Sequence, residues 1–290
     1  MGVITMDTIA LVDKYPASDE RVQAEKIVRS IGGPAAVAAI TLARQGINAA
    51  IVGTIGKDQD GDAIIEIFKK EGVDTNGISR SEEPTSGSVI LVSKSEKTRS
   101  ISTRQPISQI APGNEAKEIL KSAEWIHVDH VGISQLERLE IKRGDGPLIS
   151  FDAGYGVKDF DVKKVDLFAP NHVQMKDRHP DMSTEEATEA DSIGGENLVV
   201  TTIGSSGSVG FSKESGLVRA DSIKGEILST LGAGDVFHGA ILAALFQGKP
   251  LESALKIANI VAGLSCRGLD GTSAIPTSAE LQTYLENGHK

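Results

Sequence analysis

Hydrophobic and polar positions alternate regularly in the second half of the chain. Short apolar runs predict strands at residues 125–128, 148–152, 167–170 and 198–202. Amphipathic segments at 134–142 and 184–190, which predict helices, lie between these strands. Strands that alternate with helices are typical of a mostly parallel sheet flanked by helices, so the pattern predicts an α/β fold.

The rest of the chain continues this organisation with two additions. Further helices are predicted at 35–45, 63–71, 235–247, 251–263 and from Ser278, and further strands at 49–53 and 208–212. Ile9, Leu11 and the segment 21–29 alternate loosely enough to form exposed strands, and 88–93 with 99–103 predicts a hairpin. We expect the hairpin to lie outside the main core, because its outer face is polar.

Composition and charge exclude several classes of protein. The 290 residues include 30 Lys+Arg and 40 Asp+Glu, which gives a formal net charge of -10. This charge disfavours non-specific binding to nucleic acid or to an anionic membrane. Cys266 is the single cysteine and cannot form an internal disulfide. No apolar stretch approaches the roughly 18 residues that a membrane span requires. We therefore expect a cytoplasmic protein without nucleic-acid or membrane partners.

The strongest chemical motif is the run from Ser229 to Ala240, in which Gly232 and Gly234 flank Ala233 just before a predicted helix. Backbone N–H groups can converge there on a negative oxygen at the positive end of the helix dipole. Asp235 falls in the first helical turn, where it can accept a proton from a hydroxyl beside such an anion. A simple turn with Asp235 as a helix cap would produce the same local pattern.

Two further glycine-containing segments are candidates for ligand contact. Gly32 and Gly33 precede a helix of small residues and would let the backbone approach a ligand closely, although they also suit a tight turn. The segment from Thr201 to Gly207 is a strand that ends in a small polar turn, where ligands collect in such sheets. Neither a Walker loop nor a dinucleotide fingerprint occurs. The histidines show no metal-ligand spacing with the lone cysteine, so a zinc site is not expected.

Together these segments resemble the ribokinase family of carbohydrate kinases, also called the PfkB family. The resemblance covers nearly the whole chain through Gly32-Gly33, the run from Val52 to Gly61, and Thr230 to Asp235. Within the family, some segments resemble ketohexokinases and others resemble sulfofructose kinases. The resemblance implies one ribokinase-like domain over residues 1–290, with a small β-sheet lid inserted at about 8–30 and 86–105.

The resemblance also assigns roles by position. It implies that Asp235 is the catalytic base and that the amides of Gly232, Ala233 and Gly234 form an anion hole. The other implied assignments are Asp7, Gly32 and Gly33 for the sugar, Thr202, Gly204, Gly207 and Asn259 for the nucleotide, and Asn171 for magnesium. Apart from the resemblance, Arg104 is a candidate to contact a polar or anionic substrate, with a solvated surface residue as the alternative. The expected cofactors are ATP and Mg²⁺, with K⁺ as a further candidate, and the lid implies a homodimer.

Four positions depart from the family pattern. Val37 stands where Asn is usual, and Ser229 replaces the commoner Asp. The motif that begins at Asn171 ends in Gln174 where Glu is usual. The chain also starts close to its first strand, which is therefore expected to be shortened. His238 is expected to be structural or adjacent to the nucleotide.

The sequence thus predicts ATP-dependent phosphorylation of a primary hydroxyl of a small sugar, with a ketose or a pentose favoured. No arginine equivalent to a sulfonate-binding residue is found near Asp129 to Val131, which favours a neutral sugar. A nucleoside kinase on the same fold, and a regulatory protein that binds nucleotide or sugar with little catalysis, remain alternatives.

Overall fold

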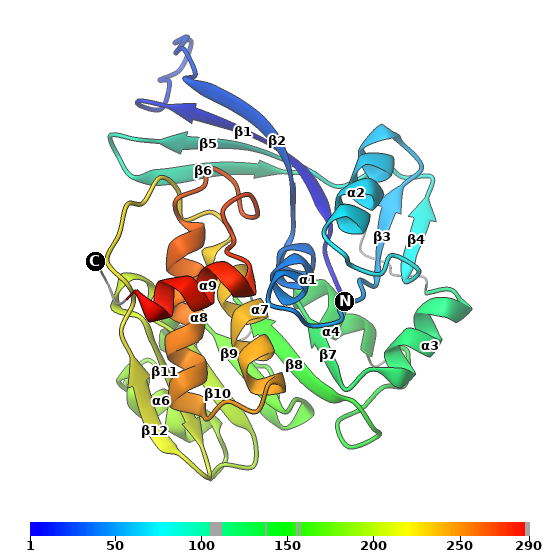
Figure 1. Ribbon diagram of the computed structural model, residues 1–290, viewed down its shortest axis with the longest axis vertical. Helices are drawn as coiled ribbons and strands as arrows, with labels where there is room; N and C mark the ends of the chain where they lie inside the picture. The colour runs from blue at the N-terminus through cyan, green and yellow to red at the C-terminus, as the bar shows by residue number, and fades with distance from the viewer. Residues whose placement is uncertain (105–111, 137, 155, 157, 288–290) are drawn as a thin grey trace.

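The computed structural model describes residues 1–104, 112–136, 138–154, 156 and 158–287. The last position of the second predicted lid segment, residue 105, lies outside these described residues. The predicted α/β architecture, a mostly parallel sheet flanked by helices with a separate small sheet, is confirmed (Figure 1).

The largest sheet has six strands in the order β12-β11-β10-β9-β8-β7. Its strands are β7 (Trp125–Val128), β8 (Leu148–Ala153), β9 (Leu167–Pro170), β10 (Leu198–Thr202), β11 (Ser208–Ser212) and β12 (Gly216–Ala220). Strands β7 to β10 run parallel, whereas β11 and β12 are antiparallel to their neighbours. The parallel strands are mainly apolar because helices cover both faces of the sheet.

Helices pack against this sheet and against one another. They are α1 (Pro34–Arg44), α2 (Gln59–Lys70), α3 (Asn114–Ser122), α4 (His130–Leu136), α5 (His172–Arg178), α6 (Thr184–Asp191), α7 (Ala233–Phe246), α8 (Leu251–Ser265) and α9 (Ser278–Glu286), with short 3₁₀ turns at η1 (Val162–Lys164) and η2 (Gly204–Ser206). Helices α1 and α7 approach closely, because a Cβ on Gly239 would lie 2.6 Å from the Cβ of Thr41. This packing fixes α7, whose first turn carries the strongest motif.

The lid is a four-stranded sheet in the order β2-β1-β5-β6. It consists of β1 (Thr5–Val12), β2 (Lys26–Gly32), β5 (Ser88–Ser93) and β6 (Thr98–Thr103). Its inner face buries Ile9, Leu11, Ile90 and Val92 against Leu269. The lid therefore extends beyond the six-stranded sheet and meets the segment between α8 and α9 (Figure 1).

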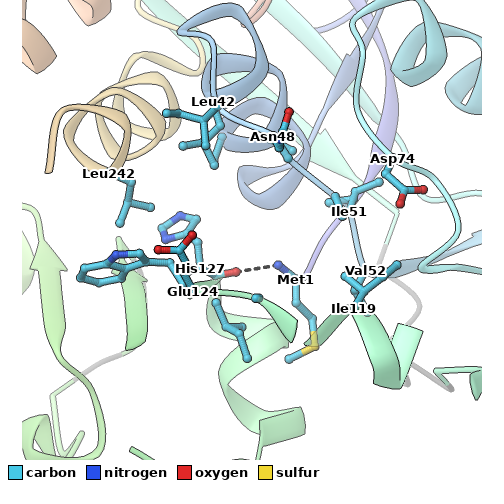
Figure 2. A pocket seen from close by; sticks show the side chains of 18 of the residues that line it. Met1, Leu42, Asn48, Ile51, Val52, Asp74, Ile119, Glu124, His127 and Leu242 are labelled. Carbon is cyan, nitrogen blue, oxygen red and sulfur yellow. Dashed lines mark hydrogen bonds between the residues drawn. The ribbon is translucent and has the colours of Figure 1, made fainter. Parts of the chain in front are cut away.

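The first residues lie between the six-stranded sheet and a separate parallel pair, β3 (Gly53–Gly56) and β4 (Ile78–Ser81). The N-terminal ammonium of Met1 donates to the carbonyl of His127 at 2.6 Å, and Gly2 N–H donates to the carbonyl of Val52 at 3.0 Å. Burial lowers the pKa of this ammonium to about 6, opposed by the charge of Asp129. A cavity of about 490 Å³ lies beside these residues (Figure 2).

Several predicted boundaries were wrong, each for a local reason. The helix expected at 134–142 is α4 and begins at His130, because the side chain of Asp129 accepts the N–H groups of Val131 and Gly132. The strand expected at 49–53 begins only at Gly53. The strand expected at 21–29 is β2, which begins at Lys26 and continues to Gly32. Helix α7 starts at Ala233, two residues earlier than expected.

Among the described residues, none of the helices combines the length and the apolar character that crossing a bilayer requires.

Candidate active site

The carboxyl ends of the parallel strands bring polar side chains to one edge of the six-stranded sheet. Asp129 follows β7, Asp152 lies near the end of β8, Asn171 follows β9 and Thr202 ends β10. The N–H of Gly154 donates to Asp152 Oδ1 at 3.0 Å, and Asn171 Nδ2 donates to the Gly154 carbonyl at 3.1 Å. Ligands of open α/β sheets bind at this edge, so the topology alone places a candidate site here.

The first turn of α7 lies at the same edge and requires glycine at its start. Gly232 has φ 74°, and a Cβ there would lie 2.8 Å from the Cα of Gly271. The N–H of Val236 donates to the Gly232 carbonyl at 2.9 Å and closes the first helical turn. Open N–H groups at such a turn can bind an anion.

The three amides predicted for the anion hole are not equivalent. The N–H of Ala233 donates to the Thr230 carbonyl at 3.3 Å, so it is engaged in the turn. Gly234 is exposed, and a Cβ there would meet no atom within 4 Å. Space for a ligand therefore exists beside Gly234, and the anion hole itself stays a prediction.

Asp235 lies half-buried in this first turn. Burial raises the pKa of its carboxyl to about 8, and the charge of Asp152 raises it further, whereas His238 and Arg99 act in the opposite direction. A carboxyl whose pKa lies near neutral pH is matched to accept a proton in a general-base step. The environment of Asp235 is thus that of a candidate base, and its catalytic role stays a prediction.

The lid contributes a cation to the same place. Arg99 on β6 pairs in register with the buried Val92, so both lie on the inner face of the lid. Its Nη1 donates to Thr230 Oγ1 at 2.9 Å, two residues before Gly232. Arg99 was not predicted from the sequence, because in a polar strand only the register shows which side chain faces the site.

The residues predicted for the sugar meet at the base of the lid. A Cβ on Gly32 would lie 2.1 Å from Asp7 Oδ2 and 2.7 Å from Thr5 Oγ1, so the three positions share one small space. Asp7 Oδ1 accepts the N–H of Ser88 at 2.9 Å, and burial raises the pKa of Asp7. Thr5 Oγ1 is buried without a hydrogen-bond partner. Such a group is costly unless a ligand or water satisfies it.

Two other sugar candidates lie nearby. Gly33 has φ 93°, and a Cβ there would lie 2.4 Å from the carbonyl oxygen of Val3, which explains glycine at this turn. Arg104 is exposed, and its Nη1 donates to the Thr85 carbonyl at 3.2 Å. Both stay predictions as sugar contacts.

The loop around Asp270, which was not predicted from the sequence, connects the region of Asp7 and Gly32 with α7. Asp270 Oδ1 accepts the N–H groups of Thr272 and Ser273 at 2.8 and 2.7 Å. Thr272 Oγ1 lies 3.3 Å from Ser30 Oγ on β2, and Gly271 contacts Gly232. The loop thus contacts β2 beside Asp7 on one side and the first turn of α7 on the other.

The residues predicted for the nucleotide lie around the turn between β10 and β11. Thr202 pairs with Ser208, and a Cβ on Gly207 would lie 2.1 Å from the carbonyl oxygen of Ala220. Asn259 Nδ2 donates to Ser208 Oγ at 3.0 Å and to that same carbonyl at 2.9 Å. Gly204 forms part of the same turn, because its carbonyl accepts the N–H of Gly207 at 3.1 Å.

Asn171, the predicted magnesium residue, caps helix α5. Its Oδ1 accepts the N–H groups of Val173 and Gln174, both at 3.0 Å. The side-chain oxygen is therefore used within the fold, and its metal role stays a prediction.

The sequence model of the pfkB family carbohydrate kinases matches residues 1–140 and 162–278. The chain belongs to this family. The predicted enzyme class, a sugar kinase, is thereby confirmed.

Known relatives span the full length of this kinase. It is 28% identical over 295 residues to a ribokinase of Bacillus subtilis, covering 98% of each chain. It is 25% identical over 292 residues to a ketohexokinase of Mus musculus, covering 93% of this chain and 97% of the relative.

Solved structures confirm the ribokinase-like fold of this kinase. The ribokinase of Thermotoga maritima has a TM-score of 0.82 at 24% identity, covering 99% of this chain and 98% of the other. The ribokinase of Arabidopsis thaliana complexed with ribose and ATP has a TM-score of 0.81 at 21% identity, with 97% and 96% covered. The nucleoside kinase of Methanocaldococcus jannaschii has a TM-score of 0.79 at 20% identity, with 99% and 97% covered.

Proposed function

We propose that this kinase transfers the γ-phosphoryl group of ATP to a primary hydroxyl of a small sugar, with Asp235 as the base. One observation carries the proposal: Asp235 lies in the open first turn of α7, with Arg99 reaching that turn from the lid. The Asp7 and Gly32 pocket would hold the sugar, and the turn at Gly207 would border the nucleotide.

The proposed reaction needs a single in-line displacement. The sugar hydroxyl oxygen forms a bond to the γ-phosphorus, its proton passes to an Asp235 carboxylate oxygen, and the bond to the β-phosphate oxygen breaks to release ADP. The hydroxyl is not ionised beforehand, because its pKa lies far above neutral pH. N–H groups of the first turn, with Gly234 beside open space, would stabilise the charge on the transferring group.

The nucleotide and its metal are supported by different observations. The solved ribokinase of Arabidopsis thaliana contains ATP, which supports ATP as the phosphate donor here. Mg²⁺ would neutralise charge on the phosphate oxygens, and Asp235 and Thr202 at this edge of the sheet offer oxygen atoms for its bound waters. Activation by K⁺ stays a prediction.

The experiment measures ADP release with a panel of ketoses, pentoses, phosphorylated and sulfonated sugars, and nucleosides. We expect turnover with a neutral ketose or pentose, and a fall in kcat of about 10²- to 10⁴-fold in Asp235→Asn, because a general base supplies about that factor. ATP affinity should stay within about twofold. Asp177→Asn, on an exposed part of α5, is the matched control.

The outcomes separate the alternatives. Near-normal turnover by Asp235→Asn would remove the proposed base. A nucleoside as the sole productive acceptor would make the protein a nucleoside kinase. Binding of ATP and a sugar without turnover would instead support a regulatory binding protein.

We also propose that the lid pairs with a second copy of the chain. Ile27 on β2 and Val89 on β5 are 66% and 60% exposed. They pair with Ala10 and Thr8 of β1, which places both on the outer face of the lid. An exposed apolar face of this kind favours association.

A further inference from the structure

Three side chains from separate elements meet beneath the first turn of α7. His127 lies on β7, Asp152 on β8, and His238 on α7, three residues after Asp235. One possible ligand atom from each lies within 4.8 Å of the others. Asp152 and His238 are only 7% and 5% exposed. His238 acts on Asp235 through its charge, but the proposed phosphoryl transfer does not explain why His127 and Asp152 meet it.

Three of the four imidazole nitrogens of this cluster lack hydrogen-bond partners. Nε2 of His127 and both ring nitrogens of His238 are buried without one. His238 Nδ1 lies 2.8 Å from Asp152 Oδ2, which is within ion-pair distance. Buried polar atoms are rarely left unsatisfied. Unsatisfied ring nitrogens that lie close to a carboxylate are expected where all of these atoms are ligands of one bound metal ion.

The remaining polar atoms of two of these side chains are held by neighbours. His127 Nδ1 forms a hydrogen bond with Ser150 Oγ at 3.0 Å, which fixes the ring and leaves Nε2 directed at the cluster. Asp152 Oδ1 accepts the N–H of Gly154 at 3.0 Å, which leaves Oδ2 beside His238. Metal-binding histidines and carboxylates are commonly oriented by such outer hydrogen bonds.

We propose that His127, Asp152 and His238 bind one divalent transition-metal ion of the zinc class. Two imidazoles and one carboxylate form a ligand set that zinc and related ions accept, with a water in the open position. Mg²⁺ and Ca²⁺ prefer oxygen ligands, so this site differs in chemistry from one for the metal that accompanies ATP. Sequence spacing gives no sign of the site, because its ligands are separated by 25 and 86 residues.

The surroundings of the cluster suit a cation. Asp152 and Asp129 both act through their charge on Asp235, so acidic groups are concentrated around this turn of α7. His127 also lines the cavity of about 490 Å³ beside Met1 and Leu242 (Figure 2). One of the three proposed ligand residues thus borders a cavity.

The test measures metal binding by the whole chain without nucleotide or sugar, so its result is independent of the proposed function. The untagged protein is stripped with a chelator, loaded with Zn²⁺ or Co²⁺ and passed over a desalting column. We expect one equivalent per chain by elemental analysis, and visible bands of four- or five-coordinate Co²⁺. His127→Gln and His238→Gln should each weaken Zn²⁺ binding at least 100-fold. His172→Gln, at an exposed position on α5, should leave it unchanged.

Several results would overturn the site. Retention of less than 0.1 equivalent by the folded wild-type protein would exclude it, whatever the behaviour of the variants. Equal binding by His238→Gln and His172→Gln would assign the metal to another place. Circular dichroism checks that each variant is folded, and if one is not, the wild-type stoichiometry and the other variant still decide.

Discussion

Arg99 of the lid donates a hydrogen bond to Thr230 Oγ1 at 2.9 Å, joining β6 to the segment that starts α7. The two residues are 131 positions apart in the chain. The contact sets the guanidinium beside the turn where a phosphate is expected, and Arg99 also lowers the pKa of Asp235 through its charge. The lid therefore has two functions in this proposal, to cover the site and to supply a positive charge.

Removing the charge of Arg99 should weaken the interaction of the enzyme with the phosphate groups of ATP. In Arg99→Ala we expect kcat/KM for ATP to fall about 10- to 100-fold, because a hydrogen bond to a charged group contributes about 1.5–3 kcal/mol. Steady-state kinetics at saturating sugar measure the effect. Lys26→Ala removes the same charge from an exposed position of the lid and serves as control. Equal losses in both variants would show a general charge effect instead.

The two glycines of the α7 turn should respond differently to alanine. Gly232→Ala forces a left-handed residue with φ 74° and a Cβ 2.8 Å from Gly271, so we expect destabilisation of about 1–3 kcal/mol. Gly234→Ala meets no atom and lies within the helix, so the fold should keep its stability. Denaturant unfolding compares the two. Similar midpoints would contradict the structural role of Gly232.

The sugar pocket is tested at Asp7. Asp7→Asn keeps the shape of the side chain but removes its charge, so hydroxyl groups of the sugar lose a strong acceptor. We expect kcat/KM for the sugar to fall about 10- to 100-fold while KM for ATP changes little. Asp13→Asn, an exposed residue just after β1, is the control. A selective rise in the KM for ATP would move Asp7 to the nucleotide side.

The partly buried ion pair between Arg44 and Glu71 predicts how the stability of the fold depends on pH. Arg44 binds both carboxylate oxygens of Glu71 at 2.8 Å, and these hydrogen bonds lower the pKa of Glu71. A depressed folded-state pKa stabilises the protein above the unfolded value near 4.5, and this contribution disappears as pH falls through the folded value. Glu71→Gln should therefore cost about 1 kcal/mol at pH 7 and progressively less in acid.

Urea unfolding of wild type and Glu71→Gln at several pH values measures this difference. Glu66→Gln breaks an exposed pair with Lys69 and should have little effect at any pH. A difference that grows as the pH falls would reverse the expected sign.

Association through the lid is tested at its outer face. Ile27→Lys places a charge on the strand edge and should shift a dimer towards monomer, because burying an unpaired charge is costly. Sedimentation velocity at micromolar concentration measures the mass, with Leu217→Lys, on exposed β12, as the control. A monomeric wild-type protein would remove the proposed dimer.

The sequence predicted elements well where hydrophobic pattern decides the structure. Strands β9 and β10 occupy the predicted residues, because a run that is buried on both faces must be apolar throughout. Strand β12 was missed, since the edge strand Gly216–Ala220 has few buried positions and no strong alternation. The start of α4 was misplaced because a side-chain cap at Asp129 decided it.

The residues of the candidate site likewise fall into those that could be predicted from the sequence and those that could not. Glycines such as Gly232 could be identified locally, because a motif places them next to a helix start. Arg99, the Asp270 loop and the pairing of Asp152 with His238 could not, because each depends on contacts between distant segments. Helix spacing shows that His238 follows Asp235 by one turn, but it does not show which strand end lies opposite.

Strand β1 begins at Thr5, includes Asp7 and continues as a central strand of the lid, paired with β2 along its length. The acid expected to hold the sugar and the sheet above it are therefore one unbroken length of backbone. A shift of the lid would move Asp7, and a ligand held by Asp7 would resist that shift. If Asp7 holds the sugar as proposed, sugar binding and movement of the lid are linked through this one strand.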